Sequence, residues 1–220
     1  MLFHMDLSEH RDDPLIANAS NPKKLALCLS GGGYRAMLYH VGALWRLNEW
    51  GFLLKLGLIS SVSGGSITAG VLGLNWGNLV FDGNSCAVNF EEKVVAPILM
   101  TADRTIDIPC TLLGIFDAGG AGHRVATYHE KHLFGSATLQ DLPDESTSPR
   151  FIFNASNLQT AVNWRFCRAF MGDYRVGLIH NPSVKLSVAV AASGAFPPFL
   201  SPLRLKLSSN QYVKDDKTVV

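Results

Sequence analysis

Residues Leu25–Trp76 read LALCLSGGGYRAMLYHVGALWRLNEWGFLLKLGLISSVSGGSITAGVLGLNW, and this stretch decides the fold. It contains two short apolar runs, Leu25–Leu29 and Leu58–Val62, and each leads into a glycine-containing turn followed by a helical pattern. A strand, a helix and a second parallel strand form a right-handed βαβ unit. The two turns should therefore lie at the same edge of one sheet and face each other.

Helices are expected after both turns. Apolar residues at helical spacing predict one helix over Tyr34–Trp50, ended by Gly51, and a second over Ile67–Leu74, whose small residues permit close packing. The continuous apolar run Leu25–Leu29 is typical of a strand covered on both faces of a parallel sheet. We therefore expect Cys28 to be buried.

The pattern changes in the second half of the chain. Arg150–Ala155 and Val162–Phe170 are rich in aromatic and β-branched residues, which indicates two neighbouring strands instead of another crossover. The remaining predicted elements are helices over Phe90–Met100, His123–Phe134 and Val184–Ala195 and a strand over Leu203–Leu207.

Length and composition favour one well-buried domain. The chain has 220 residues, of which 47% are hydrophobic and 17% charged, with a formal net charge of +1. Residues 1–23 are interpreted as a polar lead-in and residues 24–220 as the folded domain. Because no stretch is rich in lysine and arginine, the composition argues against nucleic acid as a partner.

The sequence predicts a cytoplasmic protein. The first residues lack the basic start and apolar stretch of a secretory signal, and no apolar run approaches the length of a transmembrane helix. Peripheral contact with a membrane stays open. The four cysteines form no closely spaced pair, so we expect reduced thiols, and no metal-binding spacing of histidines occurs, so no metal is assigned.

Ser63 stands where the second strand turns into the following helix. A nucleophile elbow requires this context, because a sharp strand-to-helix turn exposes the serine hydroxyl above the sheet edge. Gly64 and Gly65 follow, whereas Ser61 replaces the first glycine of the G-x-S-x-G pattern. The alternative interpretation makes Ser61, Ser63 and Ser66 ordinary turn and cap serines.

Gly31, Gly32 and Gly33 form a loop between the first strand and its helix. Consecutive glycines point several N–H groups into one place, and a helix N-terminus favours negative charge there. Such a loop binds either the phosphates of a dinucleotide or an oxyanion. A dinucleotide site requires an acidic residue at the end of the second strand, but SSVSGGS stands there and Glu49 lies within the helix, so the oxyanion hole is favoured.

Three segments together carry a family resemblance: GGGYRA, SVSGG and, near the C-terminus, AASGAFPPFLSP. In combination they resemble the patatin-like phospholipases. The resemblance implies a three-layer α/β sandwich with a mostly parallel central sheet flanked by helices. It also implies hydrolysis of acyl esters in phospholipids or related lipids without a cofactor, so a lipid or acyl ester is the expected partner.

The resemblance also implies roles for individual residues. Ser63 would be the nucleophile, and the N–H groups around Gly31, Gly32 and Gly33 would form the oxyanion hole. Arg35 matches the basic residue of the family's glycine loop. Gly64 and Gly65 would support the elbow.

The sequence departs from the family pattern in three places. Two are mild: Ser61 in the elbow, and Ala36 in place of the last glycine of the loop. The third concerns the aspartate of the family's Ser–Asp dyad, which belongs to an Asp-Gly-Gly or Asp-Gly-Ala motif after the proline-rich segment. We expect that motif beyond Val220, so that the domain is incomplete at its C-terminus, lacks one or more strands and is inactive or nearly so.

Other aspartates fit the dyad poorly. Asp117 begins the sequence DAGG but precedes the proline-rich segment, and Asp215 and Asp216 belong to a charged stretch typical of a solvated turn. No dyad aspartate is therefore assigned within the chain. A histidine base is an alternative, with His180 the strongest candidate; the others, interpreted as surface or capping residues, are His40, His123, His129 and His132.

Two further functions remain open on the same scaffold. An acyltransferase would use Ser63 and the glycine loop but pass the acyl group to an alcohol instead of water. A non-catalytic lipid-binding protein would keep the fold and lose the chemistry, as the unassigned aspartate allows.

Overall fold

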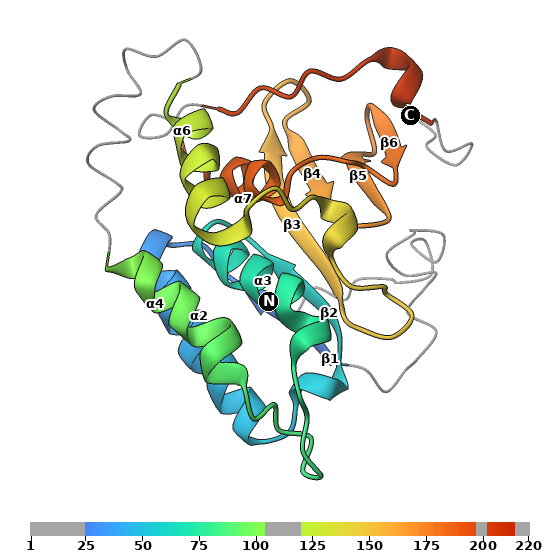
Figure 1. Cartoon of the computed structure of the whole chain (residues 1–220). Helices are drawn as coiled ribbons and strands as arrows, with labels where there is room; N and C mark the ends of the chain where they lie inside the picture. Colours follow the sequence, from blue (N-terminus) through green and yellow to red (C-terminus); the bar gives the residue numbers. More distant parts are fainter. Residues whose placement is uncertain (1–24, 104–119, 197–201, 214–220) are drawn as a thin grey trace, which may run out of the picture.

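The computed structural model describes residues 25–103, 120–196 and 202–213 (Figure 1). Its centre is a six-stranded sheet in which the strands follow one another in sequence order, β1 to β6. The strands are β1 (Leu25–Leu29), β2 (Leu56–Ser61), β3 (Arg150–Asn157), β4 (Val162–Phe166), β5 (Phe170–Asp173) and β6 (Gly177–His180). The first three are parallel, and the remainder pair in antiparallel fashion.

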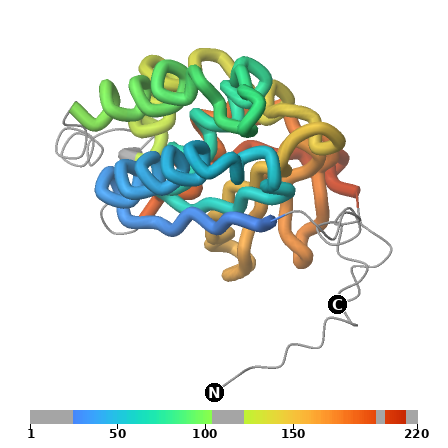
Figure 2. The backbone as a smooth tube through the Cα atoms, turned by 90° about the horizontal axis from the view of Figure 1, so that it is seen from below, coloured from blue at the N-terminus to red at the C-terminus, as the bar shows by residue number. Residues whose placement is uncertain are grey.

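The helices of the described residues gather on one side of this sheet, as Figure 2 shows. They are α2 (Gly33–Glu49), α3 (Gly64–Asn75), α4 (Ala96–Ala102), α6 (Gly120–His129) and α7 (Leu186–Gly194). Two π-helical segments, Glu91–Val95 and Glu130–Phe134, adjoin α4 and α6, and short 3-10 turns cover Leu53–Lys55, Trp76–Asn78, Leu139–Asp141 and Ser209–Gln211. The predicted α/β sandwich, a central sheet with flanking helices, is confirmed.

The hydrophobic core lies between the sheet and these helices. Met37 and Leu44 of α2 are completely buried, as are Ile59 of β2, Leu72 of α3 and Phe153 of β3. Burying side chains of this size is worth roughly 1.5–3 kcal/mol each, so this layer supplies the main stabilisation of the domain. Within the described residues, no helix combines the length and the hydropathy needed to cross a bilayer.

The prediction for Cys28 is wrong. β1 is an edge strand that pairs only with β2 among the described strands, and Cys28 is exposed. An apolar run of five residues does not distinguish an edge strand from a central one. Cys86 and Cys167 are also free thiols, and burial raises the pKa of Cys167 to about 11.

Two predicted strands differ from the structure. Val162–Phe170 is divided into β4 and β5, because a turn at Cys167 reverses the chain. Residues 203–207 alternate between half-buried and exposed side chains, yet they form no strand. Leu205 and Leu207 pack against the core without a neighbouring strand. The alternation of apolar residues therefore reflects burial of one side of an extended segment and not hydrogen bonding to another strand.

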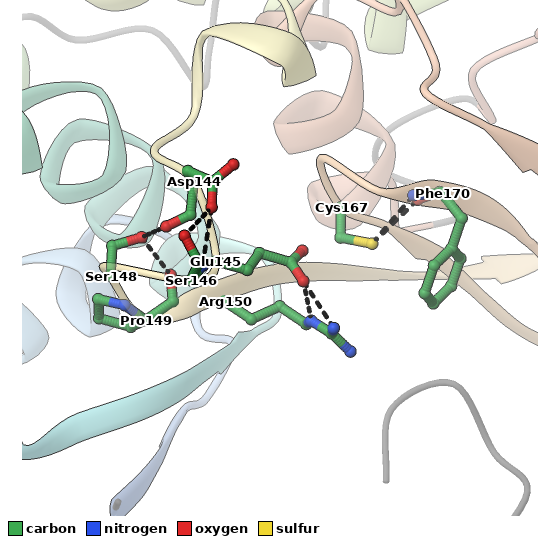
Figure 3. A network of polar contacts seen from close by, with 8 residues as sticks. All are labelled: Asp144, Glu145, Ser146, Ser148, Pro149, Arg150, Cys167 and Phe170. Atoms are coloured by element: carbon green, nitrogen blue, oxygen red, sulfur yellow. Dashed lines mark hydrogen bonds and ion pairs between the residues drawn. The ribbon is translucent and has the colours of Figure 1, made fainter. Parts of the chain in front are cut away.

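The loop before β3 is held by short-range polar contacts (Figure 3). Asp144 accepts hydrogen bonds from the amide and hydroxyl of Ser146, which lower the pKa of its carboxyl group, and Ser148 Oγ donates to the Asp144 carbonyl oxygen at 2.6 Å. Glu145 Oε2 accepts from Nε and Nη2 of Arg150, both at 2.6 Å. The loop therefore fixes the start of β3 through neighbouring residues.

Candidate active site

The structure brings the two glycine-containing turns into contact. β1 and β2 are parallel neighbours, and the amide of Val62 donates to the carbonyl oxygen of Leu29 at 3.0 Å. A Cβ atom placed on Gly31 would lie only 3.3 Å from Cβ of Ser63. The glycine loop therefore lies against the serine turn, and the turns face each other as the βαβ pattern predicts.

The backbone of Ser63 is strained. Its φ of 53° and ψ of −119° are rare for a residue with a side chain, and such conformations cost on the order of 1–3 kcal/mol. Ser63 is the N-cap residue of α3, but its side chain makes no capping hydrogen bond. Ser63 is half-buried, and its hydroxyl has no hydrogen bond to a described residue, which does not fit an ordinary cap serine.

The glycines after Ser63 are required by close backbone approach. A Cβ on Gly64 would lie 2.0 Å from the carbonyl oxygen of Gly33, and one on Gly65 would lie 2.6 Å from that of Leu29. Neither backbone can move away without breaking the contact between α3 and the elements beside it. Small residues are therefore a steric necessity at this turn.

The glycine loop keeps its donors available. Gly31, Gly32 and Gly33 are exposed, and their N–H groups have no acceptor among the described residues. Gly32 and Gly33 have φ values of 137° and 62°, which side chains disfavour. Because the loop leads directly into the N-terminus of α2, these donors can bind a negatively charged oxygen beside Ser63. Arg35 lies exposed in the first turn of α2.

Sequence reasoning missed a serine that contacts this turn from far along the chain. Ser193, near the C-terminal end of α7, accepts a hydrogen bond from the backbone amide of Ser63 at 2.9 Å. Its hydroxyl also lies 2.8 Å from Ser66 Oγ, which donates to Ser61 Oγ at 3.0 Å. The segment AASGAFPPFLSP carried the resemblance, but nothing in its residue types indicated a contact with the elbow.

None of the candidate histidines is hydrogen-bonded to Ser63. His40 is buried in α2, and its Nε2 donates to the carbonyl oxygen of Ser30 at 2.9 Å, so it supports the start of the glycine loop. His180 ends β6, at the other edge of the sheet. His129 is buried against aromatic rings, and this burial lowers its pKa to about 4. Neither His123 nor His132 is hydrogen-bonded to Ser63.

The aspartates weighed for the dyad fall outside the described residues. Asp117, Asp215 and Asp216 all belong to segments that the structure does not describe. Among the described residues, no carboxylate is hydrogen-bonded to Ser63 Oγ.

Comparison with protein families gives one match over most of the chain. The family model for patatin-like phospholipases matches residues 27–213. A search of curated proteins found no significant match.

Solved structures show a related fold. Human GIVD cytosolic phospholipase A2 in complex with methyl gamma-linolenyl fluorophosphonate and terbium chloride superposes with a TM-score of 0.55 at 15% identity, covering 78% of this chain. A second structure of that enzyme with the fluorophosphonate gives 0.50, also at 15% identity and 78% coverage of this chain. The chain spans only 30% and 29% of the lengths of these two structures. The ExoU–SpcU complex of Pseudomonas aeruginosa gives 0.40 at 18% identity, covering 88% of this chain and 41% of the other.

Proposed function

The chain belongs to the patatin-like phospholipase family, and we propose that it hydrolyses acyl ester bonds of phospholipids or related lipids with Ser63 as nucleophile. One observation carries the proposal. A serine with strained backbone and an unbonded hydroxyl lies against a glycine loop whose N–H groups are also unbonded among the described residues. Nucleophile and oxyanion donors are thereby available at one place.

In this mechanism the Oγ of Ser63 attacks the ester carbonyl carbon. A carbon–oxygen bond forms, and the carbonyl oxygen becomes negatively charged. The N–H groups of Gly31, Gly32 and Gly33, together with the positive end of the α2 dipole, would stabilise that charge. The alcohol leaves, and water then releases the fatty acid from the acyl-serine.

The proton of the Ser63 hydroxyl requires a base. The family resemblance assigns this role to an aspartate of an Asp-Gly-Gly or Asp-Gly-Ala motif, and the described residues contain neither tripeptide. The proposal therefore names no general base among them. Arg35 is given a supporting role, because its exposed side chain adds positive charge beside the oxyanion loop.

The test uses the full-length gene product and phosphatidylcholine vesicles. Wild-type protein should release free fatty acid, and Ser63→Ala should lower the rate at least about 10³-fold because the nucleophile is lost. Ser60→Ala is the control, since Ser60 lies in β2, three residues before Ser63, and its hydroxyl accepts a hydrogen bond from Asn154. Equal rates for Ser63→Ala and wild type would reject Ser63 as nucleophile.

The same assay separates the other functions of this scaffold. Transfer of the acyl group to an added alcohol in preference to water would identify an acyltransferase. Binding to vesicles without either product would identify a non-catalytic lipid-binding protein. Each result would overturn the proposed hydrolysis.

A further inference from the structure

A chain of hydroxyl hydrogen bonds begins at the backbone of Ser63. The amide of Ser63 lies 2.9 Å from Ser193 Oγ, and Ser193 Oγ lies 2.8 Å from Ser66 Oγ. Ser66 Oγ donates to Ser61 Oγ at 3.0 Å. The last hydrogen bond of the chain runs from Ser61 Oγ to the carbonyl oxygen of Ile152, 3.1 Å away. The chain thus joins α7, α3, β2 and β3 around the elbow.

Its direction follows from proton counting. Each serine hydroxyl carries one proton, and a carbonyl oxygen can only accept. Ser61 must donate to Ile152, so it accepts from Ser66; Ser66 has then used its proton and must accept from Ser193. Ser193 is therefore left to accept from the amide of Ser63, which is the contact observed. Each hydroxyl proton therefore has one acceptor, so the hydrogen bonds of the chain can run in only one direction.

Burial makes this arrangement rigid. Ser61 and Ser66 are 1% and 0% exposed, and Ser193 is 8% exposed, so bulk water cannot substitute for a lost link. A chain of satisfied hydrogen bonds in a poorly solvated interior orients each member. The amide of Ser63 is consequently held by a hydroxyl of α7, which is itself fixed by the rest of the chain of hydrogen bonds.

We propose that Ser193 is a positioning residue for Ser63, an inference that rests on the proposed function. It acts through the backbone: the Ser193 hydroxyl holds the Ser63 amide and so maintains the strained φ of 53° that sets the direction of the nucleophile's Oγ. The next residue supports this reading, since a Cβ on Gly194 would lie 3.8 Å from Ser63 Oγ. The end of α7 thus anchors the elbow and adds no side chain beside the hydroxyl.

Helix α7 also provides a matched control. Ser187 is completely buried on the same helix, and its hydroxyl has no hydrogen-bond partner among the described residues. Replacing either serine by alanine removes one buried oxygen from α7. Only the change at Ser193 removes a contact with the elbow.

The experiment compares wild type, Ser193→Ala, Ser193→Thr and Ser187→Ala in the full-length protein. The first readout is hydrogen exchange of the Ser63 amide, which does not depend on activity. Ser193→Ala should speed this exchange about tenfold or more, whereas Ser187→Ala should leave it unchanged. The second readout is turnover of a soluble p-nitrophenyl ester, where Ser193→Ala should lower kcat roughly 10- to 100-fold with KM within about twofold. Ser193→Thr, which keeps the hydroxyl, should recover part of both effects.

The outcomes separate this inference from the proposed function. If Ser193→Ala turns over substrate like wild type, or if Ser187→Ala is impaired equally, the positioning role is wrong. If Ser193→Ala speeds amide exchange but the wild type cleaves no ester, the anchor exists and the proposed hydrolysis fails. Should Ser193→Ala not fold, Ser193→Cys replaces the hydroxyl that accepts from the Ser63 amide by a weakly accepting thiol, and unchanged kcat and amide exchange in that variant would also contradict the proposal.

Discussion

The turn after β2 and the loop before β3 lie at opposite ends of two parallel strands and use their polar groups in opposite ways. In the loop, the partners of Asp144 and Glu145 lie two to five residues away, and an ion pair fixes the start of β3. At the turn, the Ser63 amide is held by Ser193, 130 residues further along the chain. The loop is a local structure, whereas the turn exists only in the folded domain.

The two regions differ in whether their polar groups are left free to bind or react with another molecule. In the loop, the amide and the hydroxyl of Ser146 both donate to Asp144 Oδ1, so these polar groups satisfy one another. At the turn, the backbone is strained and firmly held, but Ser63 Oγ and the N–H groups of the glycine loop have no partner among the described residues. A folded chain can keep such groups unpaired only where the surrounding structure fixes them.

The largest effect is expected from adding one methyl group at the turn. Gly64→Ala should destabilise the domain by at least about 3 kcal/mol, because the new Cβ would lie 2.0 Å from the carbonyl oxygen of Gly33. Urea unfolding measures the change. Gly42→Ala is the control: a Cβ added at Gly42, within α2, would meet no atom within 4 Å, so alanine should stabilise the protein by about 0.5–1 kcal/mol. Similar stability of both variants would refute the close approach.

The second prediction concerns pH. The bonds at the turn involve neutral hydroxyls, so the pH dependence of stability should come from elsewhere, and buried His129 is the main source. Its pKa is about 4 in the folded state against 6.5 normally, so the unfolded chain binds the proton more readily. Stability should be complete above pH 6.5 and fall by about 3 kcal/mol as the pH decreases to 4.

His129→Phe removes this titration while keeping a ring beside Phe134. The difference between its free energy of unfolding and that of wild type should therefore change by about 3 kcal/mol between pH 7 and pH 4. Urea unfolding at a series of pH values gives that difference. A difference that is constant across the range would show that His129 is not buried in its neutral form.

A smaller effect is expected at the loop. Glu145→Gln should lower stability by roughly 1–3 kcal/mol, because the largely buried Arg150 loses the carboxylate that faces it. Its kcat should stay at the wild-type value, since the loop lies away from Ser63. Glu130→Gln breaks the more exposed pair with Lys185 and should cost at most about 1 kcal/mol. Equal losses in stability would show that burial does not strengthen the Glu145–Arg150 pair. A lower kcat for Glu145→Gln would remove the contrast between the loop and the turn.

The sequence was sufficient for the parts of the fold whose signals are local. β1 occupies the predicted residues Leu25–Leu29, and the turn beginning at Ser63 lies where the strand–glycine–helix pattern predicts. The contact between the two turns also followed, because parallel neighbouring strands end at one edge. Periodicity and glycine placement carry this information directly.

What could not be predicted depends on contacts between distant segments. Cys28 is exposed although its neighbour Leu29 is buried, because the described helices cover only one face of the sheet, which the residues of β1 do not reveal. In the sequence, Ser61 is a departure from the glycine of the G-x-S-x-G pattern, but its hydroxyl donates a hydrogen bond to the carbonyl oxygen of Ile152. Ser193 carries no local sign of its contact with Ser63, since that contact requires α7 to pack beside α3.

One measurement tests the central claim most directly. The full-length protein is incubated with a fluorophosphonate, which forms a covalent bond with an activated serine, and the modified peptide is identified by mass spectrometry. We expect one adduct, located on Ser63, and none on the Ser63→Ala variant. An adduct on another residue that persists in Ser63→Ala, or ester hydrolysis by a protein that the reagent leaves unmodified, would contradict the assignment of Ser63 as the nucleophile.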